Sequence, residues 1–259
     1  MLGFVLLLLF ASTAHAQEIV SLGTRAGVTQ SFFIANMGGE KAQAVALLFI
    51  GGGGYINLRM EDGQPKFGAG NFLPRSRAEF IRNGILPVIM DNPSDQRSHE
   101  GMSDVFRAGA QHATDIRAVV VEVKRRHPGL PVFLVGTSRS TISVAYLGRA
   151  FGDEVAGVVL SSSMFYINRR SLLAGFDFSA IKVPLLFVHH HDDGCAATPY
   201  GEAAALGAKY PLVSVRGGKP PQSGPCDPFA AHGFFGKEPE TVDAIAAWML
   251  DKPYRKEID

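Results

Sequence analysis

The sequence predicts an α/β fold in which helices cover both faces of a mostly parallel central sheet. Its strongest support is a set of short, continuous apolar runs, which are typical of strands buried on both faces. These runs span residues 44–50, 85–90, 132–135, 155–160 and 183–189. Segments with helical periodicity separate them, and strands that alternate with helices form parallel sheets. Polar or glycine-rich stretches follow several runs, as expected where ligand sites form at the carboxyl ends of such strands.

The remaining elements are predicted from periodicity and end signals. Residues 18–24 and 28–35, separated by Arg25-Ala26-Gly27, suggest an antiparallel strand pair ahead of the parallel sheet. A short strand is expected at 212–215. Helices are expected at 72–83, 103–126, 141–151, 200–209 and 238–250, the second of them capped by Ser103-Asp104 and stopped by His127-Pro128-Gly129.

Residues 1–16 are predicted to be a secretory signal peptide. The apolar run Met1–Phe10 is too short to span a bilayer, and Ala14-His15-Ala16 follows it as a cleavage site. We expect the mature chain to begin near Gln17, to form one domain over residues 17–259, and to be secreted or periplasmic. No later apolar stretch approaches the roughly 20 residues of a membrane helix.

Charge and cysteine content restrict the partners. The net charge of +1 comes from 25 basic and 24 acidic residues spread along the chain, so no stripe for nucleic acid or anionic lipid is expected. A small-molecule acyl substrate is compatible with this charge balance, and the oligomeric state is not predicted. The two cysteines, Cys195 and Cys226, suggest one disulfide in a secreted protein, which would stabilise the fold by about 3 to 4 kcal/mol.

Ser138 is the candidate nucleophile. It lies in Gly136-Thr-Ser-Arg-Ser140, between the apolar run 132–135 and the helical segment 141–151. In a Gly-x-Ser-x-Gly elbow the serine occupies a strained turn that exposes its hydroxyl, and small neighbours let strand and helix approach closely. The match departs from that pattern at Ser140, where serine replaces glycine.

A reactive serine requires a base, and the base requires an acid. Among the histidines, only His232 lies in the loop between the last predicted strand and the last helix, so it is the candidate base. Asp192 and Asp193 compete as the acid. Neighbouring strand residues point to opposite faces, so only one of them faces the serine. Asp193 is favoured because it enters the turn Asp-Gly-Cys, and Asp192 is then structural.

Together these motifs resemble the α/β-hydrolase superfamily over nearly the whole mature chain, and in particular its secreted bacterial, esterase-like members. The order Ser138, Asp193, His232 is the order of that superfamily's triad. Phe49-Ile-Gly-Gly-Gly-Gly-Tyr55 resembles its oxyanion loop after the third strand, although Gly51 stands where lipases and esterases often carry histidine. The resemblance implies oxyanion donors at the N–H of Arg139 and of Gly52 or Gly53. It also implies that a Cys195–Cys226 disulfide ties the acid loop to the base loop.

The activity implied by this resemblance is hydrolysis of a carboxylic ester by a serine hydrolase, through an acyl-enzyme and without a cofactor. The alternatives are a peptidase or thioesterase of the same fold, or a binding protein that retains the fold without turnover. An apolar pocket and a small lid formed by residues 164–182 are expected. The residues considered for that pocket are Tyr55, Met164, Phe165, Tyr166, Phe234 and Phe235.

A metal site in His189-His-His-Asp-Asp193 was weighed as a rival interpretation. At most His189 and His191 share one face of a strand, so these residues cannot all converge on one ion. No metal is therefore expected.

Overall fold

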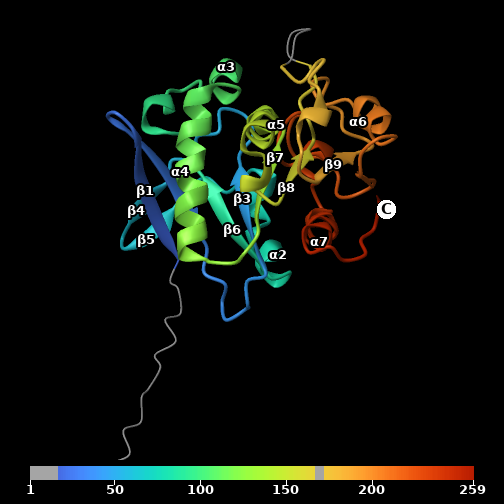
Figure 1. Ribbon diagram of the computed structural model, residues 1–259. Coiled ribbons are helices and arrows are strands. Elements are labelled where there is room, and N and C mark those ends of the chain that lie inside the picture. The colour runs from blue at the N-terminus through green and yellow to red at the C-terminus, as the bar shows by residue number, and fades with distance from the viewer. Residues whose placement is uncertain (1–16, 167–171) are drawn as a thin grey trace, which may run out of the picture.

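The computed structural model describes residues 17–166 and 172–259, and within these ranges nine strands form one twisted sheet (Figure 1). Its order is β1-β2-β6-β3-β7-β8-β9-β10-β11, with β2 antiparallel to its neighbours β1 and β6 and all other neighbours parallel. The predicted mostly parallel sheet is confirmed. The strands are β1 Glu18–Arg25, β2 Val28–Ile34, β3 Ala44–Phe49, β6 Ile85–Met90, β7 Val132–Thr137, β8 Gly157–Ser161, β9 Leu185–His190, β10 Leu212–Val215 and β11 Glu257–Ile258.

Helices cover both faces of the sheet, as predicted. Two separate hydrophobic clusters show this arrangement, one joining the sheet to α4, α5 and α6 and the other joining it to α1, α2 and α7. The helices are α1 Phe72–Arg75, α2 Arg77–Arg82, α3 Asp104–Arg107, α4 Ala110–Arg126, α5 Ser140–Phe151, α6 Tyr200–Leu206 and α7 Glu238–Met249.

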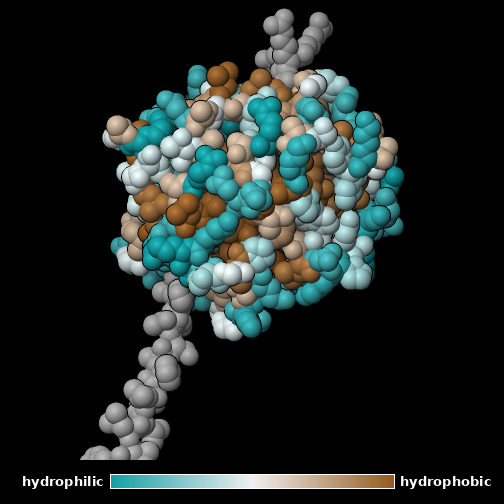
Figure 2. All heavy atoms as spheres, viewed as in Figure 1, coloured by the Kyte–Doolittle hydropathy of each residue, from teal (hydrophilic) through white to brown (hydrophobic). Residues whose placement is uncertain are grey.

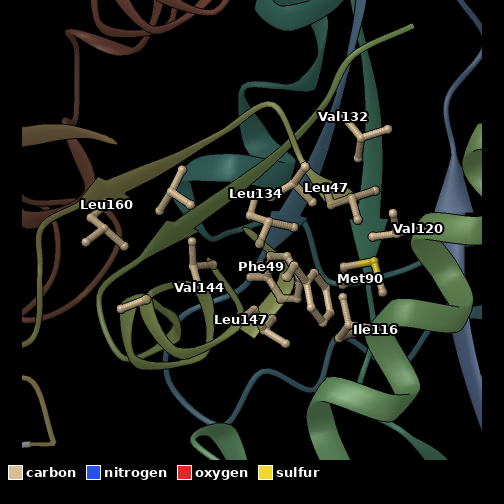
Figure 3. Close-up of a cluster of buried hydrophobic side chains, with 14 of the residues drawn as sticks. Leu47, Phe49, Met90, Ile116, Val120, Val132, Leu134, Val144, Leu147 and Leu160 are labelled. Atoms are coloured by element: carbon tan, nitrogen blue, oxygen red, sulfur yellow. The ribbon is translucent and has the colours of Figure 1, made fainter. Parts of the chain in front are cut away.

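The alternation of side chains along the central strands divides the core between these two layers. On β7, Val132 and Leu134 belong to the cluster under α4 and α5, whereas Phe133 and Val135 belong to the cluster under α7. Figure 3 shows the first cluster, in which Leu134 lies close to Leu47 of β3 and Val144 of α5. Because side chains of a strand point alternately to its two faces, a continuous apolar run is required where both faces are buried.

Two predicted helices are each divided in two. The helix expected at 72–83 is interrupted at Ser76, which is both the C-cap of α1 and the N-cap of α2. The helix expected at 103–126 is interrupted by Gly109, whose extended backbone (ψ 162°) ends α3 and starts α4. Ser103 does cap the first piece, accepting the N–H of Phe106 at 3.1 Å.

Three short strands are additional to the predicted ones. β4 (Arg59–Glu61) and β5 (Gln64–Lys66) form a small antiparallel hairpin, and β11 extends the main sheet beside β10. The predicted signal peptide, 1–16, lies outside the described residues, as does the stretch 167–171 of the predicted lid segment.

No helix within residues 17–166 and 172–259 is long and apolar enough to cross a bilayer. On the face seen in Figure 1, hydrophilic and hydrophobic residues are interspersed (Figure 2).

Candidate active site

Ser138 lies in the sharp turn between β7 and α5, with a positive φ of 55° that non-glycine residues rarely adopt. Its backbone N–H donates to the carbonyl of Ser161 at 3.0 Å, and its carbonyl accepts the hydroxyl of Thr141 at 2.6 Å. A Cβ at Gly136 would lie 2.7 Å from Val144 Cγ2, so strand and helix approach as closely as the elbow pattern requires.

Ser140, the residue that departs from the elbow pattern, is fully buried, and its hydroxyl binds two strands. It accepts the N–H of Thr137 at 2.9 Å and lies 2.7 Å from the carbonyl oxygen of Phe49, at the end of β3. Glycine at this position could form neither contact. Sequence reasoning treated Ser140 as a tolerated substitution and missed this role.

His232 lies in a 3-10 turn, Ala231–Gly233, between β10 and α7, and its imidazole binds Asp193. Nδ1 is 3.0 Å from Asp193 Oδ2, and the carboxylate side chain is fully buried. Because a carboxylate accepts, the Nδ1–H donates to it, and Nε2 is left as the basic nitrogen. Asp193 also accepts the N–H of Cys195 at 2.9 Å and the hydroxyl of Thr198 at 2.7 Å.

Thr198 is a site residue that sequence reasoning did not identify. Its side chain is buried, and Oγ1 lies 3.2 Å from His232 Nδ1 as well as bonding Asp193. This hydroxyl therefore holds both the carboxylate and the imidazole. No sequence pattern marks it, because it reaches the site only through the turn that follows Asp193.

Asp192 points to solvent, with a side chain 59% exposed that binds His191 Nδ1 at 2.9 Å. This hydrogen bond lowers the pKa of Asp192 below its ordinary value.

The three adjacent histidines occupy different environments. His189 Nε2 accepts the N–H of Ser163, His190 Nε2 lies 3.0 Å from the carbonyl of Gly217, and His191 is partly exposed.

The loop after β8 supports both the serine and the histidine. Ser161 accepts the N–H of Ser138, and Ser162, with φ 43°, donates its hydroxyl to the carbonyl of His232 at 2.8 Å. The next residue, Ser163, donates its N–H to His189 Nε2 at 2.8 Å. Burial lowers the pKa of His189 to about 3, so its ring is neutral and accepts this N–H.

The glycine loop after β3 lies against the serine. Gly51 and Gly54 close a tight turn in which the N–H of Gly54 donates to the Gly51 carbonyl at 3.1 Å. A Cβ at Gly51 would lie 3.1 Å from Ser138 Cβ, so this position leaves no room for a side chain. The buried Arg107 donates from Nη2 to the Gly52 carbonyl at 2.9 Å and so fixes the loop.

The predicted oxyanion donors differ in position. Gly52 lines the same cavity as Ser138, whereas Gly53 packs its Cα face against the carbonyl of Glu100. Arg139 begins the turn into α5, and its N–H donates to no acceptor among residues 17–166 and 172–259. Its guanidinium binds Asp104 at 2.7 Å.

Ser138 and His232 line one cavity of about 430 Å³, a size ordinary for small-molecule sites. The walls come from the loop after β3, the segment before α1, the elbow, and the disulfide-bonded loop 226–228. Polar groups face it, namely Tyr55, Asn57, Asn71 and Asp227. Among the described residues that line the cavity, only Asp227 has an acidic or basic side chain other than the imidazole of His232.

Most of the aromatic residues considered for the apolar pocket lie elsewhere. Of the residues considered, Tyr55 lines the cavity, but Phe234 is fully buried against Phe72 in the core. Phe165 stacks on His189, and with Tyr166 it lines a different cavity beside α6. Core packing of the aromatic rings determined their placement, and glycine and amide groups occupy the space beside the serine instead.

Cys195 and Cys226 form a disulfide that connects the acid loop to the loop that bears His232. Cys195 follows Asp193 by two residues, and Cys226 lines the cavity. The bond therefore closes one wall of the site.

Removing the disulfide is expected to weaken folding and activity together. The double variant Cys195→Ala/Cys226→Ala should lose about 3 to 4 kcal/mol of unfolding free energy on the chain-entropy model. Urea unfolding with and without reductant measures this loss, and ester turnover measures the effect on the site. Wild-type protein reduced by dithiothreitol is the matched control. Unchanged melting temperature and unchanged activity after full reduction would contradict both expectations.

The comparisons agree with this fold. A family model described as serine aminopeptidase, S33, matches residues 76–189. The structure of Est1E from Butyrivibrio proteoclasticus with bound ferulic acid has a TM-score of 0.61 at 16% identity, covering 90% of this chain and 100% of that one. An alpha-beta serine hydrolase homologue from Coxiella burnetii gives 0.58 at 14% identity, covering 93% and 99%.

A soluble variant of monoglyceride lipase from Saccharomyces cerevisiae, in complex with a substrate analog, has a TM-score of 0.59 at 12% identity. The alignment covers 93% of this chain and 97% of the lipase. No curated protein sequence matches the chain significantly.

A mostly parallel sheet, with a serine elbow after β7 and a histidine loop before the last helix, defines the class as an α/β hydrolase. The chain therefore has the α/β-hydrolase fold, and the family model matches it over residues 76–189.

Proposed function

We propose that this protein is a serine hydrolase that cleaves a carboxylic ester through an acyl-enzyme. One observation carries the proposal. The buried Asp193 carboxylate binds His232 Nδ1 at 3.0 Å, and His232 shares a cavity with Ser138, whose backbone is held at φ 55°. A fully buried carboxylate on an imidazole, next to a strained serine, suits nucleophilic catalysis and has no evident role in packing.

In the proposed mechanism, Ser138 Oγ attacks the acyl carbonyl while His232 Nε2 takes its proton. Asp193 holds the imidazole in the required tautomer and stabilises the imidazolium. The N–H groups of Arg139 and Gly52 bind the oxyanion. His232 then gives its proton to the departing alcohol, and water, activated by the same nitrogen, releases the acid and restores Ser138.

Covalent labelling of Ser138 tests the proposal directly. A fluorophosphonate probe is expected to add one adduct to the wild-type protein, with the modified peptide mapping to Ser138, and none to Ser138→Ala. Hydrolysis of p-nitrophenyl esters of graded chain length should be lost in Ser138→Ala to the level of the uncatalysed reaction. Labelling of another residue, or turnover that survives in Ser138→Ala, would refute the assignment. A protein that binds esters equally well with and without Ser138 but turns over none would be a binding protein.

A peptidase is the second candidate, because the matching family model is that of serine aminopeptidases. Asp227 gives this candidate some physical support, since it lines the cavity and pairs with no cationic side chain in the part of the chain that the structure describes. A carboxylate there suits a substrate ammonium group. Comparing kcat/KM for an aminoacyl p-nitroanilide with that for a p-nitrophenyl ester, in wild type and Asp227→Asn, separates the two activities.

We also propose that the protein acts outside the cytoplasm, in the periplasm or after secretion. The apolar leader 1–16 and the Cys195–Cys226 bond support this location, because disulfides persist in oxidising compartments.

A further inference from the structure

The side-chain amide of Asn71 faces the candidate nucleophile from an element that the sequence did not connect with the site. Asn71 is the N-cap of α1, with extended backbone (φ −64°, ψ 153°), and its Oδ1 accepts the N–H of Leu73 at 3.4 Å. This cap assigns the two ends of the amide, because the oxygen must face the helix N-terminus. The NH₂ group therefore points away from α1.

That NH₂ group lies beside Ser138. A Cβ atom placed on Gly51 would lie 3.1 Å from Ser138 Cβ and 3.3 Å from Asn71 Nδ2, so both residues border the space beside Gly51. Asn71 and Ser138 line the same cavity, and Nδ2 donates to no acceptor among residues 17–166 and 172–259. A half-buried donor with no partner among the described residues therefore lines the cavity that Ser138 also lines.

Arg75 fixes the segment that carries Asn71. Its guanidinium donates to the carbonyl of Gly70, to that of Pro228 at 3.1 Å and to that of Gly233 at 2.9 Å. Gly233 follows His232, so one side chain ties the Asn71 segment to the histidine loop. Arg75 also binds Glu238 of α7 at 3.1 Å. The amide is therefore preorganised, which is what an electrostatic contribution to catalysis requires.

We propose that Asn71 Nδ2 donates a hydrogen bond to the substrate oxygen that becomes the oxyanion when Ser138 attacks, as a side-chain addition to the backbone donors. This inference rests on the proposed function. A neutral amide donor suits an uncharged acyl group and strengthens its hydrogen bond as negative charge develops on that oxygen. No new bond is made to Asn71, and no proton is transferred to or from it.

Two substitutions separate this role from helix capping. Serine and aspartate cap helices about as well as asparagine, so Asn71→Ser and Asn71→Asp should keep the melting temperature of the wild type. Both remove the NH₂ donor. We expect kcat for a p-nitrophenyl ester to fall by about 10²-fold in Asn71→Ser, with KM within about threefold, as for loss of an oxyanion donor. The kcat of Asn71→Asp should fall further, because its negative carboxylate would repel the negative charge that develops on the substrate oxygen.

A boronic acid that forms a tetrahedral adduct with Ser138 gives a second readout. The affinity of the protein for this boronic acid should fall in Asn71→Ser by about the same factor as kcat. Substitution of a residue with a purely structural role would not lower both quantities by the same factor. Asn36→Ser is the matched control, since the Asn36 side chain also caps a local turn, accepting the N–H of Gly38 at 2.7 Å, and does not line the cavity. It should behave as wild type.

The outcomes distinguish the inference from the function on which it rests. If fluorophosphonate labels Ser138 and the wild type is active, but Asn71→Ser keeps wild-type kcat, only the donor role is refuted. Loss confined to Asn71→Asp, or loss that follows a lower melting temperature, also refutes it. Wild-type protein that neither reacts with the probe nor hydrolyses esters overturns both.

Discussion

Asp193→Asn is expected to lower kcat/KM for an activated ester by about 10⁴-fold, as when a buried triad aspartate loses its charge. Asparagine preserves the shape of the side chain, but its NH₂ group in place of Oδ2 would oppose the N–H of His232 Nδ1. The imidazole would then carry its proton on Nε2, which is the nitrogen that must be unprotonated to act as the base. The effect is large because Asp193 is fully buried and no water replaces the lost acceptor.

Asp192→Asn is the matched control, one residue away in the chain. Asp192 is exposed and binds His191 rather than His232, so ester turnover should remain within about threefold of wild type. Circular dichroism and melting temperature establish that both variants fold. The reverse pattern, with Asp192→Asn inactive and Asp193→Asn active, would show that Asp192 is the acid.

Mild acid is expected to destabilise the fold through two buried histidines. Burial lowers the pKa of His112 on α4 and of His189 on β9 to about 3, and the positive charge of Arg107 adds to the effect at His112. The unfolded chain binds these protons near pH 6.5, so the unfolded state holds more protons between pH 6.5 and 3. Stability is therefore complete above about pH 6.5 and falls as the pH drops through this window. At pH 5 each histidine should cost about 2 kcal/mol.

The measurement is urea unfolding between pH 7.5 and 4.5, followed by the fluorescence of Trp248, which packs against Phe133. His112→Leu removes one of the two titrating groups and should reduce the acid dependence by about half. It should not destabilise the protein at pH 7, because both ring nitrogens of His112 are buried without a hydrogen-bond partner in the part of the chain that the structure describes. An unfolding free energy that is constant from pH 7.5 to 5 would contradict the assignment of neutral buried rings.

The buried strands and the order of the elements were predictable from sequence. A strand enclosed on both faces must be apolar along its length, so the apolar runs at β3, β6 and β7 could be recognised as buried strands. Such strands end at one edge of the sheet, which is why Ser138 and His232 could be expected to lie near each other. Asp193 could be preferred to Asp192 from the turn that follows it, and the structure gives Asp193 the contact with His232.

The walls of the cavity could not be predicted, because they depend on contacts between segments distant in the sequence. Arg75 joins Gly70 to Pro228 and Gly233, and this joining helps to hold the Asn71 segment at the wall of the cavity. The break at Gly109 was also missed. A single glycine inside an amphipathic pattern is compatible with a continuous helix, and the chain turns there with the buried Arg107 directed toward the carbonyl of Gly52.

Through Ser140, the turn that carries Ser138 depends on a contact formed in the folded protein and not on its own local sequence alone. Its hydroxyl joins the turn to the carbonyl of Phe49, a residue of β3 that is 91 positions earlier in the chain. The pairing of β3 and β7 at the centre of the sheet therefore adds a long-range support to the strained backbone of Ser138. A nascent chain in which these two strands are still apart lacks this support for the turn at Ser138.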